Sequence, residues 1–256
     1  MSILCYHAID ADWTSPLAVE PEAFAAQARW LARRRLVVDL DLALARIDRR
    51  GRLPRRMSAL TFDDGFVSVF EDAWPVVRDL RLPITVFLVA GTLAEPGRPI
   101  DWVDDPPPTP LRTMTLAQAL EMQDGGAVIG SHSYAHANLT ELSDDACVRD
   151  LRESRELLSE LFGTPVDLLA YPRGLNDARV RRSAERAGYR AAFTLPEVRE
   201  PVDRFGVVHV VLTLGAPLIL SAPVELRREH GPRRICVAMP RRHFLRHFVD
   251  ADAADA

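Results

Sequence analysis

Short apolar runs alternate along the chain with segments in which apolar residues recur every three to four positions. The runs have the length and the β-branched or aromatic character of strands, and they fall at residues 3–9, 57–62, 84–89, 127–131, 167–171 and 189–195. The segment after Pro21 predicts a first helix with Phe24, Ala28 and Leu31 on one face. Regular alternation of strands and helices predicts an α/β fold with a parallel sheet, open or closed into a barrel.

The remaining predicted helices are marked by residues that begin, interrupt or end a helix. Pro75 should kink or restart the helix at 67–80, and a further helix precedes the strand at 127–131. Ser143 caps a long helix that runs to Phe162, and Gly188 closes the helix that begins at residue 177. These signals support one continuous domain.

Two regions depart from this alternation. Residues 95–113 hold six of the 19 prolines, which predicts a surface loop that is either a plain connection or a wall or lid over a substrate. Arginine-rich pieces dominate the chain after Gly215. We therefore expect residues 1–215 to form the main domain, which would carry any active site, and residues 216–256 to be a C-terminal extension packed on it or trailing from it.

Composition and charge narrow the class of protein. A net charge of −4 and a pI near 6.0 give no overall positive potential of the kind that attracts nucleic acid, so a nucleic-acid-binding protein is not indicated. The three cysteines are far apart and suggest neither a disulfide framework nor a cysteine metal site. No stretch reaches 18 apolar residues, and the first ten residues, MSILCYHAID, lack the pattern of a secretion signal, so we expect a cytoplasmic protein with no membrane span. The oligomeric state cannot be inferred.

Candidate chemistry is concentrated where predicted strands end. Asp63 and Asp64 follow one apolar run in ALTFDDGF, and His132 and His136 follow another in GSHSYAHANL. The ends of parallel strands meet at one edge of a sheet, so these side chains should lie together. One carboxylate and two histidines four residues apart can form a three-ligand metal site with open positions for water and substrate.

The sequence resembles the polysaccharide deacetylase family, the NodB-homology carbohydrate esterases of family 4. The resemblance is carried by TFDDG, by SHSYAH followed by NLTELS, and by LLAYPRG. The opening LCYHAI is similar to the subgroup that includes poly-N-acetylglucosamine deacetylases. The family implies a distorted (β/α) barrel and a metal-dependent hydrolase that removes the N-acetyl group from a sugar, glycan or glycoconjugate.

The resemblance also implies roles for individual residues. Asp64, His132 and His136 would bind a divalent metal, commonly Zn²⁺, with Co²⁺, Ni²⁺, Mn²⁺ or Fe²⁺ as other options. Asp63 would be the general base, and the backbone N–H of Tyr171 would donate to the oxyanion. Better-known members carry an arginine before the proline of this motif, whereas this chain has Arg173 after Pro172. Arg173 therefore either orients Asp63 or faces solvent.

The general acid and the substrate contacts are less defined by the sequence. The subgroup implies His7 as the acid that protonates the leaving amine, and His209, in FGVVHVVLT, is the alternative. If the 95–113 loop is a substrate wall, Trp102 could stack on a sugar ring.

Two other functions fit parts of the pattern. A non-haem iron oxygenase also uses two histidines and a carboxylate, but it normally has a β-rich fold and would leave Asp63 without a task. A carbohydrate-binding barrel that has lost catalysis would not need the intact set of Asp63, Asp64, His132 and His136.

Overall fold

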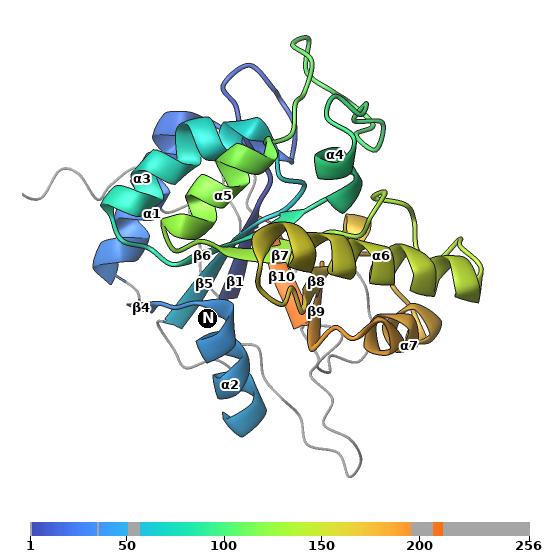
Figure 1. Cartoon of the computed structure of the whole chain (residues 1–256). Coiled ribbons are helices and arrows are strands. Elements are labelled where there is room, and N and C mark those ends of the chain that lie inside the picture. The colour runs from blue at the N-terminus through green and yellow to red at the C-terminus, as the bar shows by residue number, and fades with distance from the viewer. Residues whose placement is uncertain (1, 35, 51–56, 196–206, 212–256) are drawn as a thin grey trace, which may run out of the picture.

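The computed structural model describes residues 2–34, 36–50, 57–195 and 207–211 (Figure 1). The C-terminal extension expected at 216–256, and the domain limit at 215, lie outside these residues. No helix in the described part of the chain is both long and apolar enough to cross a bilayer. The expected cytoplasmic location stays a prediction.

The centre of the molecule is a ring of parallel strands. Pairing passes from β1 to β5, then through β6, β7, β8, β9 and β10, and returns to β1. The strands are β1 (Ser2–Tyr6), β5 (Met57–Phe62), β6 (Ile84–Leu88), β7 (Val128–Ser131), β8 (Leu168–Ala170), β9 (Ala191–Thr194) and β10 (Val207–Val211). A short β4 (Leu36–Val37) pairs with the start of β5. The distorted barrel expected from the resemblance is therefore confirmed, and the distortion is plain between β7 and β8, where only Ser131 and Leu169 are in register.

Alternation along the strands separates two apolar clusters. Leu60 and Phe62 of β5 belong to the cluster beneath the outer helices, whereas Ala59 belongs with Ile3 and Phe87 in a second cluster. Successive side chains of a strand point to opposite faces. Asp63, two positions beyond Thr61, continues the set that includes Ala59, which directs it into the barrel.

The helices lie outside the ring (Figure 1). They are α1 (Pro21–Arg34), α2 (Leu40–Arg50), α3 (Trp74–Asp79), α4 (Ala90–Ala94), α5 (Leu116–Asp124), α6 (Asp144–Phe162) and α7 (Ala178–Ala187). As predicted, α1 buries Phe24, Ala28 and Leu31. The Ser143 hydroxyl accepts from the Ala146 N–H at the start of α6, and Gly188 closes α7 with a φ of 94°.

Some local predictions needed correction. The strand expected at 3–9 ends at Tyr6, and His7 separates it from β2 (Ala8–Ile9), which pairs with β3 (Ala18–Val19). The helix around Pro75 contains a π-helical turn, η1 (Val69–Ala73), before α3. Proline lacks an N–H and disturbs the preceding turn, which accounts for this irregularity.

Helix α2 was missing from the sequence-based prediction. Its residues Leu40, Ala43 and Leu44 pack in the same cluster as Ile3 and Ala59, near the beginning of the strands. This helix supplies apolar cover for that part of the barrel, while the polar residues gather at the other end of the strands.

Candidate metal and catalytic site

The carboxyl ends of four strands supply the candidate site, and the first of them is β1, which His7 follows. Asp63 and Asp64 follow β5, His132 follows β7, and the turn η2 (Pro172–Gly174) follows β8. The sheet ladder continues past two of these ends, because the Asp63 N–H donates to Tyr6 O at 2.9 Å and the His132 N–H donates to Leu88 O at 2.8 Å. The backbone of the site is thus anchored to neighbouring strands.

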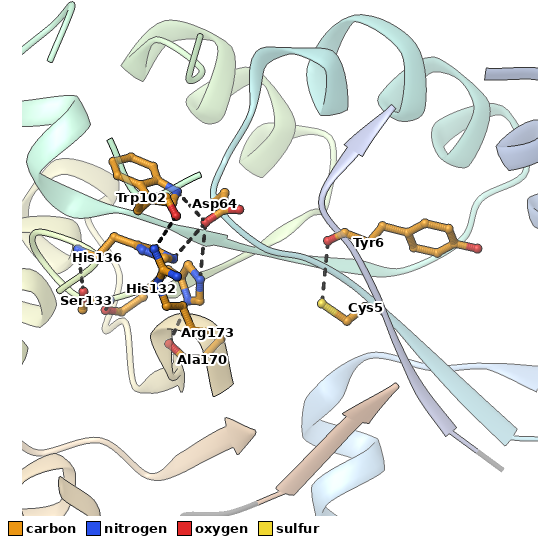
Figure 2. Close-up of polar contacts among 10 residues, drawn as sticks. Cys5, Tyr6, Asp64, Trp102, His132, Ser133, His136, Ala170 and Arg173 are labelled. Atoms are coloured by element: carbon orange, nitrogen blue, oxygen red, sulfur yellow. Dashed lines mark hydrogen bonds and ion pairs between the residues drawn. The ribbon is translucent and has the colours of Figure 1, made fainter. Parts of the chain in front are cut away.

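Asp64, His132 and His136 converge as a buried cluster, as Figure 2 shows. Asp64 Oδ1 lies 3.5 Å from His132 Nε2 and 3.2 Å from His136 Nε2. His132 Nδ1 lies 2.8 Å from the Ala170 carbonyl oxygen, a partner that places the proton on Nδ1 and leaves Nε2 as a ligand. One carboxylate oxygen and two imidazole nitrogens within 4.8 Å of one another form a donor set that fits a divalent cation.

The protonation states of the cluster suit cation binding. Burial and the neighbouring His136 lower the pKa of His132 to about 3, which keeps its imidazole neutral. Burial alone would raise the pKa of Asp64, but the hydrogen bond from His136 and the electrostatic attraction of that residue lower it below the ordinary range. An ionised carboxylate and a neutral imidazole are the forms that bind metal.

Strained backbone is concentrated at the same place. Among the described residues, four of the five non-glycine positions with positive φ belong to the site: Asp64 (67°), Ser133 (66°), His136 (55°) and Arg173 (56°). Such conformations are costly for residues with a Cβ and persist when surrounding contacts fix them. At Asp64 the turn redirects the chain, so that adjacent aspartates face different partners.

Asp63 lies beside His7 and Cys5. One ligating atom of each residue lies within 4.8 Å of the others, and all three side chains are buried. Burial, followed by the Asp64 charge, raises the pKa of Asp63 to about 8, and a hydrogen bond from the Cys5 thiol opposes the rise. Burial lowers the pKa of His7. The structure thus brings the expected base and the expected acid together.

The backbone register separates His7 from its rival. His209 of β10 is paired with Ile3, four positions before His7 on β1. At about 3.3 Å per residue, this offset is about 13 Å along the strand. The backbone of His209 therefore lies near the beginning of the strands, far from the carboxyl ends at which the other candidate residues lie.

Two contacts change the expectations for Trp102 and Arg173. Trp102 is 7% exposed and stacks on the His136 ring, so it does not offer an open surface to a sugar. Arg173 is exposed, and none of the hydrogen bonds between described residues joins it to Asp63. Its Nη2 donates to Trp102 O at 2.8 Å, and its Nη1 lies 3.1 Å from Asp104 Oδ2.

The Tyr171 amide is already engaged. Its N–H donates to Phe193 O at 3.0 Å within the sheet, which conflicts with its expected role as an oxyanion donor. Within the adjacent turn, the Gly174 N–H donates to Tyr171 O and the Leu175 N–H donates to Pro172 O. Among the described residues, no acceptor is assigned to the Arg173 N–H.

The histidine-bearing loop is held by residues that sequence analysis did not identify. Asp150 of α6 accepts from the N–H groups of Tyr134 at 3.0 Å and Ala135 at 3.3 Å. The Ser133 hydroxyl accepts from the His136 N–H at 2.9 Å. Asp150 occupies an ordinary helical position fourteen residues beyond His136, and only the tertiary contact distinguishes it.

Comparisons with known proteins agree with this geometry. A family model described as polysaccharide deacetylase matches residues 50–192. The chain is 24% identical over 195 residues to "Putative polysaccharide deacetylase YxkH" of Bacillus subtilis (strain 168), covering 76% of this chain and 64% of that protein. It is also 24% identical over 153 residues to the poly-beta-1,6-N-acetyl-D-glucosamine N-deacetylase of Staphylococcus aureus (strain MSSA476), covering 58% of this chain and 51% of that protein. The chain thus spans between half and two thirds of the length of these relatives.

Solved structures show the same fold. The Streptococcus pyogenes deacetylase PplD, in complex with acetate, has a TM-score of 0.71 at 20% identity over 84% of this chain and 93% of that one. IcaB from Ammonifex degensii has a TM-score of 0.68 at 25% identity over 83% of this chain and 91% of that one. Because the family model covers more than half of the sequence, and its strand ends carry the candidate site, the chain belongs to the polysaccharide deacetylase family.

Proposed function

We propose that the protein is a metal-dependent N-deacetylase that hydrolyses the acetamide of an N-acetylated sugar or glycan. The observation that carries this proposal is the buried Asp64, His132 and His136 cluster with a second carboxylate, Asp63, beside it. The named activity of the S. aureus relative makes β-1,6-linked N-acetylglucosamine the first substrate class to test.

The cation would be held by Asp64, His132 and His136, and we propose Zn²⁺ because imidazole and carboxylate donors suit it. A divalent cation held there would lower the pKa of a bound water molecule and polarise the amide oxygen. Its positive charge would also oppose the rise in the Asp63 pKa that burial and Asp64 cause.

The side chains divide the proton transfers of hydrolysis. Asp63 accepts a proton from the water molecule as its oxygen attacks the acetamide carbon. His7, in its imidazolium form, then donates a proton to the sugar nitrogen as the C–N bond breaks, so that acetic acid, which ionises to acetate, and a free amine leave. The closeness of Asp63 and His7 supports this assignment, since both groups must reach the same reacting amide.

The oxyanion needs a preorganised donor in addition to the cation. The Tyr171 N–H is occupied by Phe193 O, so we assign this role to the N–H of Arg173. Arg173 lies in the turn η2, beyond the residues of β8 that pair with β9, so its N–H is not part of that ladder.

Acetate release tests the proposed function directly. Protein stripped of metal and reloaded with one equivalent of Zn²⁺ should release equal amounts of acetate and free amine from β-1,6-linked N-acetylglucosamine oligomers, and chelation should stop the reaction. If the loaded protein binds such oligomers but releases no acetate from any of a panel of N-acetylated mono- and oligosaccharides, it is a binding barrel and the proposal is wrong.

A further inference from the structure

The two histidines of the cluster are oriented by different contacts. His132 has a conventional partner, because its Nδ1 lies 2.8 Å from the Ala170 carbonyl oxygen. His136 Nδ1 is buried and has no hydrogen-bond partner among the described residues. Histidines that bind metals almost always use the second ring nitrogen to fix the ring, so another contact must perform this task for His136.

Trp102 supplies such a contact. Its indole stacks on the His136 ring with centroids 4.9 Å apart and an interplanar angle of 24°. Its Nε1–H also donates to Asp64 Oδ1 at 3.2 Å, so one side chain contacts two members of the cluster (Figure 2). The stack limits rotation of the His136 ring, and the hydrogen bond fixes the carboxylate.

The backbone that carries Trp102 is held from two directions. Arg173 Nη2 donates to Trp102 O at 2.8 Å, and Trp13 Nε1 donates to Asp105 O at 2.7 Å. The ion pair of Arg173 with Asp104 is exposed on the aspartate side and contributes little by itself. The bond from Arg173 is the contact that reaches the Trp102 backbone itself, and it supports the indole together with the stack on His136 and the bond to Asp64.

We propose that Trp102 is a positioning residue for the metal, which orients His136 and Asp64, and that Arg173 acts through Trp102. This inference rests on the metal site of the proposed function and adds a coupling to it. Because the loop aligns two ligands, metal binding and ordering of the loop must favour each other to the same extent. The loop at 95–113 is accordingly a part of the metal site, and its tryptophan faces the ligands.

Metal affinity measured by competition with a chromophoric chelator tests this role without any substrate. Loss of an outer contact to a ligand typically costs about 10–100-fold in affinity. Trp102→Ala should therefore weaken Zn²⁺ binding by about 10-fold or more, and Trp102→Phe, which keeps a ring but loses the N–H, by less. Arg173→Ala should weaken binding by several-fold although it removes no ligand. Trp30→Phe is the matched indole control, because Trp30 is partly buried on α1 and is no part of the metal cluster, and it should leave Zn²⁺ affinity unchanged.

Two further measurements separate positioning from a general loss of stability. At saturating Co²⁺, the visible absorption of Trp102→Phe and Trp102→Ala should differ from that of the wild type, because the ligand geometry has changed. Metal should slow hydrogen exchange in peptides from 95–113 in the wild type and have less effect in Trp102→Ala.

The inference is overturned if both Trp102 variants bind Zn²⁺ with wild-type affinity, or if their Co²⁺ spectra match the wild type at saturation. Failure of the wild type itself to bind one metal ion would instead overturn the metal site of the proposed function. Metal binding without acetate release would leave the positioning role supported and the deacetylase activity refuted.

Discussion

Asp63 and Trp102 belong to the same site but are held in different ways, Asp63 by the backbone of a strand and Trp102 by side-chain contacts to a loop. Asp63 extends the ladder of β5, with its N–H bonded to Tyr6 O, and it points inward because alternation along the strand requires it. Trp102 lies in a loop with no strand of its own, and side-chain contacts from Arg173, Asp64 and His136 fix its place. The strand side of the site should therefore tolerate the loss of single side chains without moving, whereas the loop side depends on each contact.

The largest effect is expected at Asp63. Asp63→Asn should retain the metal and reduce turnover by about 10²–10⁴-fold, because a general base contributes this much. Asp64→Asn should instead weaken metal binding. Metal content by elemental analysis, together with the rate of acetate release, checks both variants, and loss of metal from Asp63→Asn with retention in Asp64→Asn would reverse the assignment.

His7 is the second strand-side test. His7→Ala should cut hydrolysis of an N-acetyl substrate by about 10²-fold or more and spare metal binding, because the amine leaves poorly without a proton. The loss should be much smaller for an activated acetate ester, whose leaving group needs no acid. The ratio of amide to ester activity is the measurement.

His209→Ala is the control for His7. Its backbone position on β10, level with Ile3, predicts an unchanged ratio of amide to ester activity. If the ratio falls in His209→Ala and stays at the wild-type value in His7→Ala, the acid has been assigned to the wrong histidine.

A smaller effect is expected at Asp150, which supports the histidine loop from α6. Asp150→Ala leaves the N–H groups of Tyr134 and Ala135 without their acceptor, which should lower the free energy of unfolding by about 1–3 kcal/mol. Affinity for Zn²⁺ should fall as well, since His136 lies in the loop that these bonds hold. Glu153→Ala, at an exposed position of the same helix, is the matched control; equal unfolding free energies and equal affinities in the two variants would show that the loop does not depend on Asp150.

The smallest effect is expected at Ser143, where α6 begins away from the site. Ser143→Ala removes the acceptor of the Ala146 N–H and should cost about 1 kcal/mol in unfolding free energy. Chemical denaturation measures this cost, and Zn²⁺ affinity should stay unchanged. A fall in affinity comparable to that of Asp150→Ala would mean that the whole of α6, and not one side chain, positions the histidine loop.

Much of the architecture could be predicted from local pattern. The strands at 57–62, 84–89 and 127–131 and the buried face of α1 follow from the spacing of apolar residues. The candidate ligands could be predicted because parallel strands bring their carboxyl ends to one edge. Their burial and mutual distances agree with the site expected from the sequence, while their chemical roles stay predictions.

Where the structure departs from these expectations, the departures share a physical cause, which is dependence on distant parts of the chain. Trp102 was interpreted as a stacking surface for a sugar ring. Its stack on His136 and its bond to Asp64, 38 residues away, instead place it against two of the candidate metal ligands. Arg173 was expected at Asp63 or in solvent; it is exposed, and it also donates to a carbonyl 71 residues earlier. Tyr171 was expected to offer its N–H to substrate, but the pairing of β8 with β9 uses it.

The sequence by itself determined the strand ends and the chemistry placed on them, because periodicity and the direction of a strand are local properties. Only the tertiary structure decided which loop meets the metal ligands and which amides are free to serve the substrate. A hydrogen bond from a loop has no period along the chain, and its partner is set by the closure of the barrel.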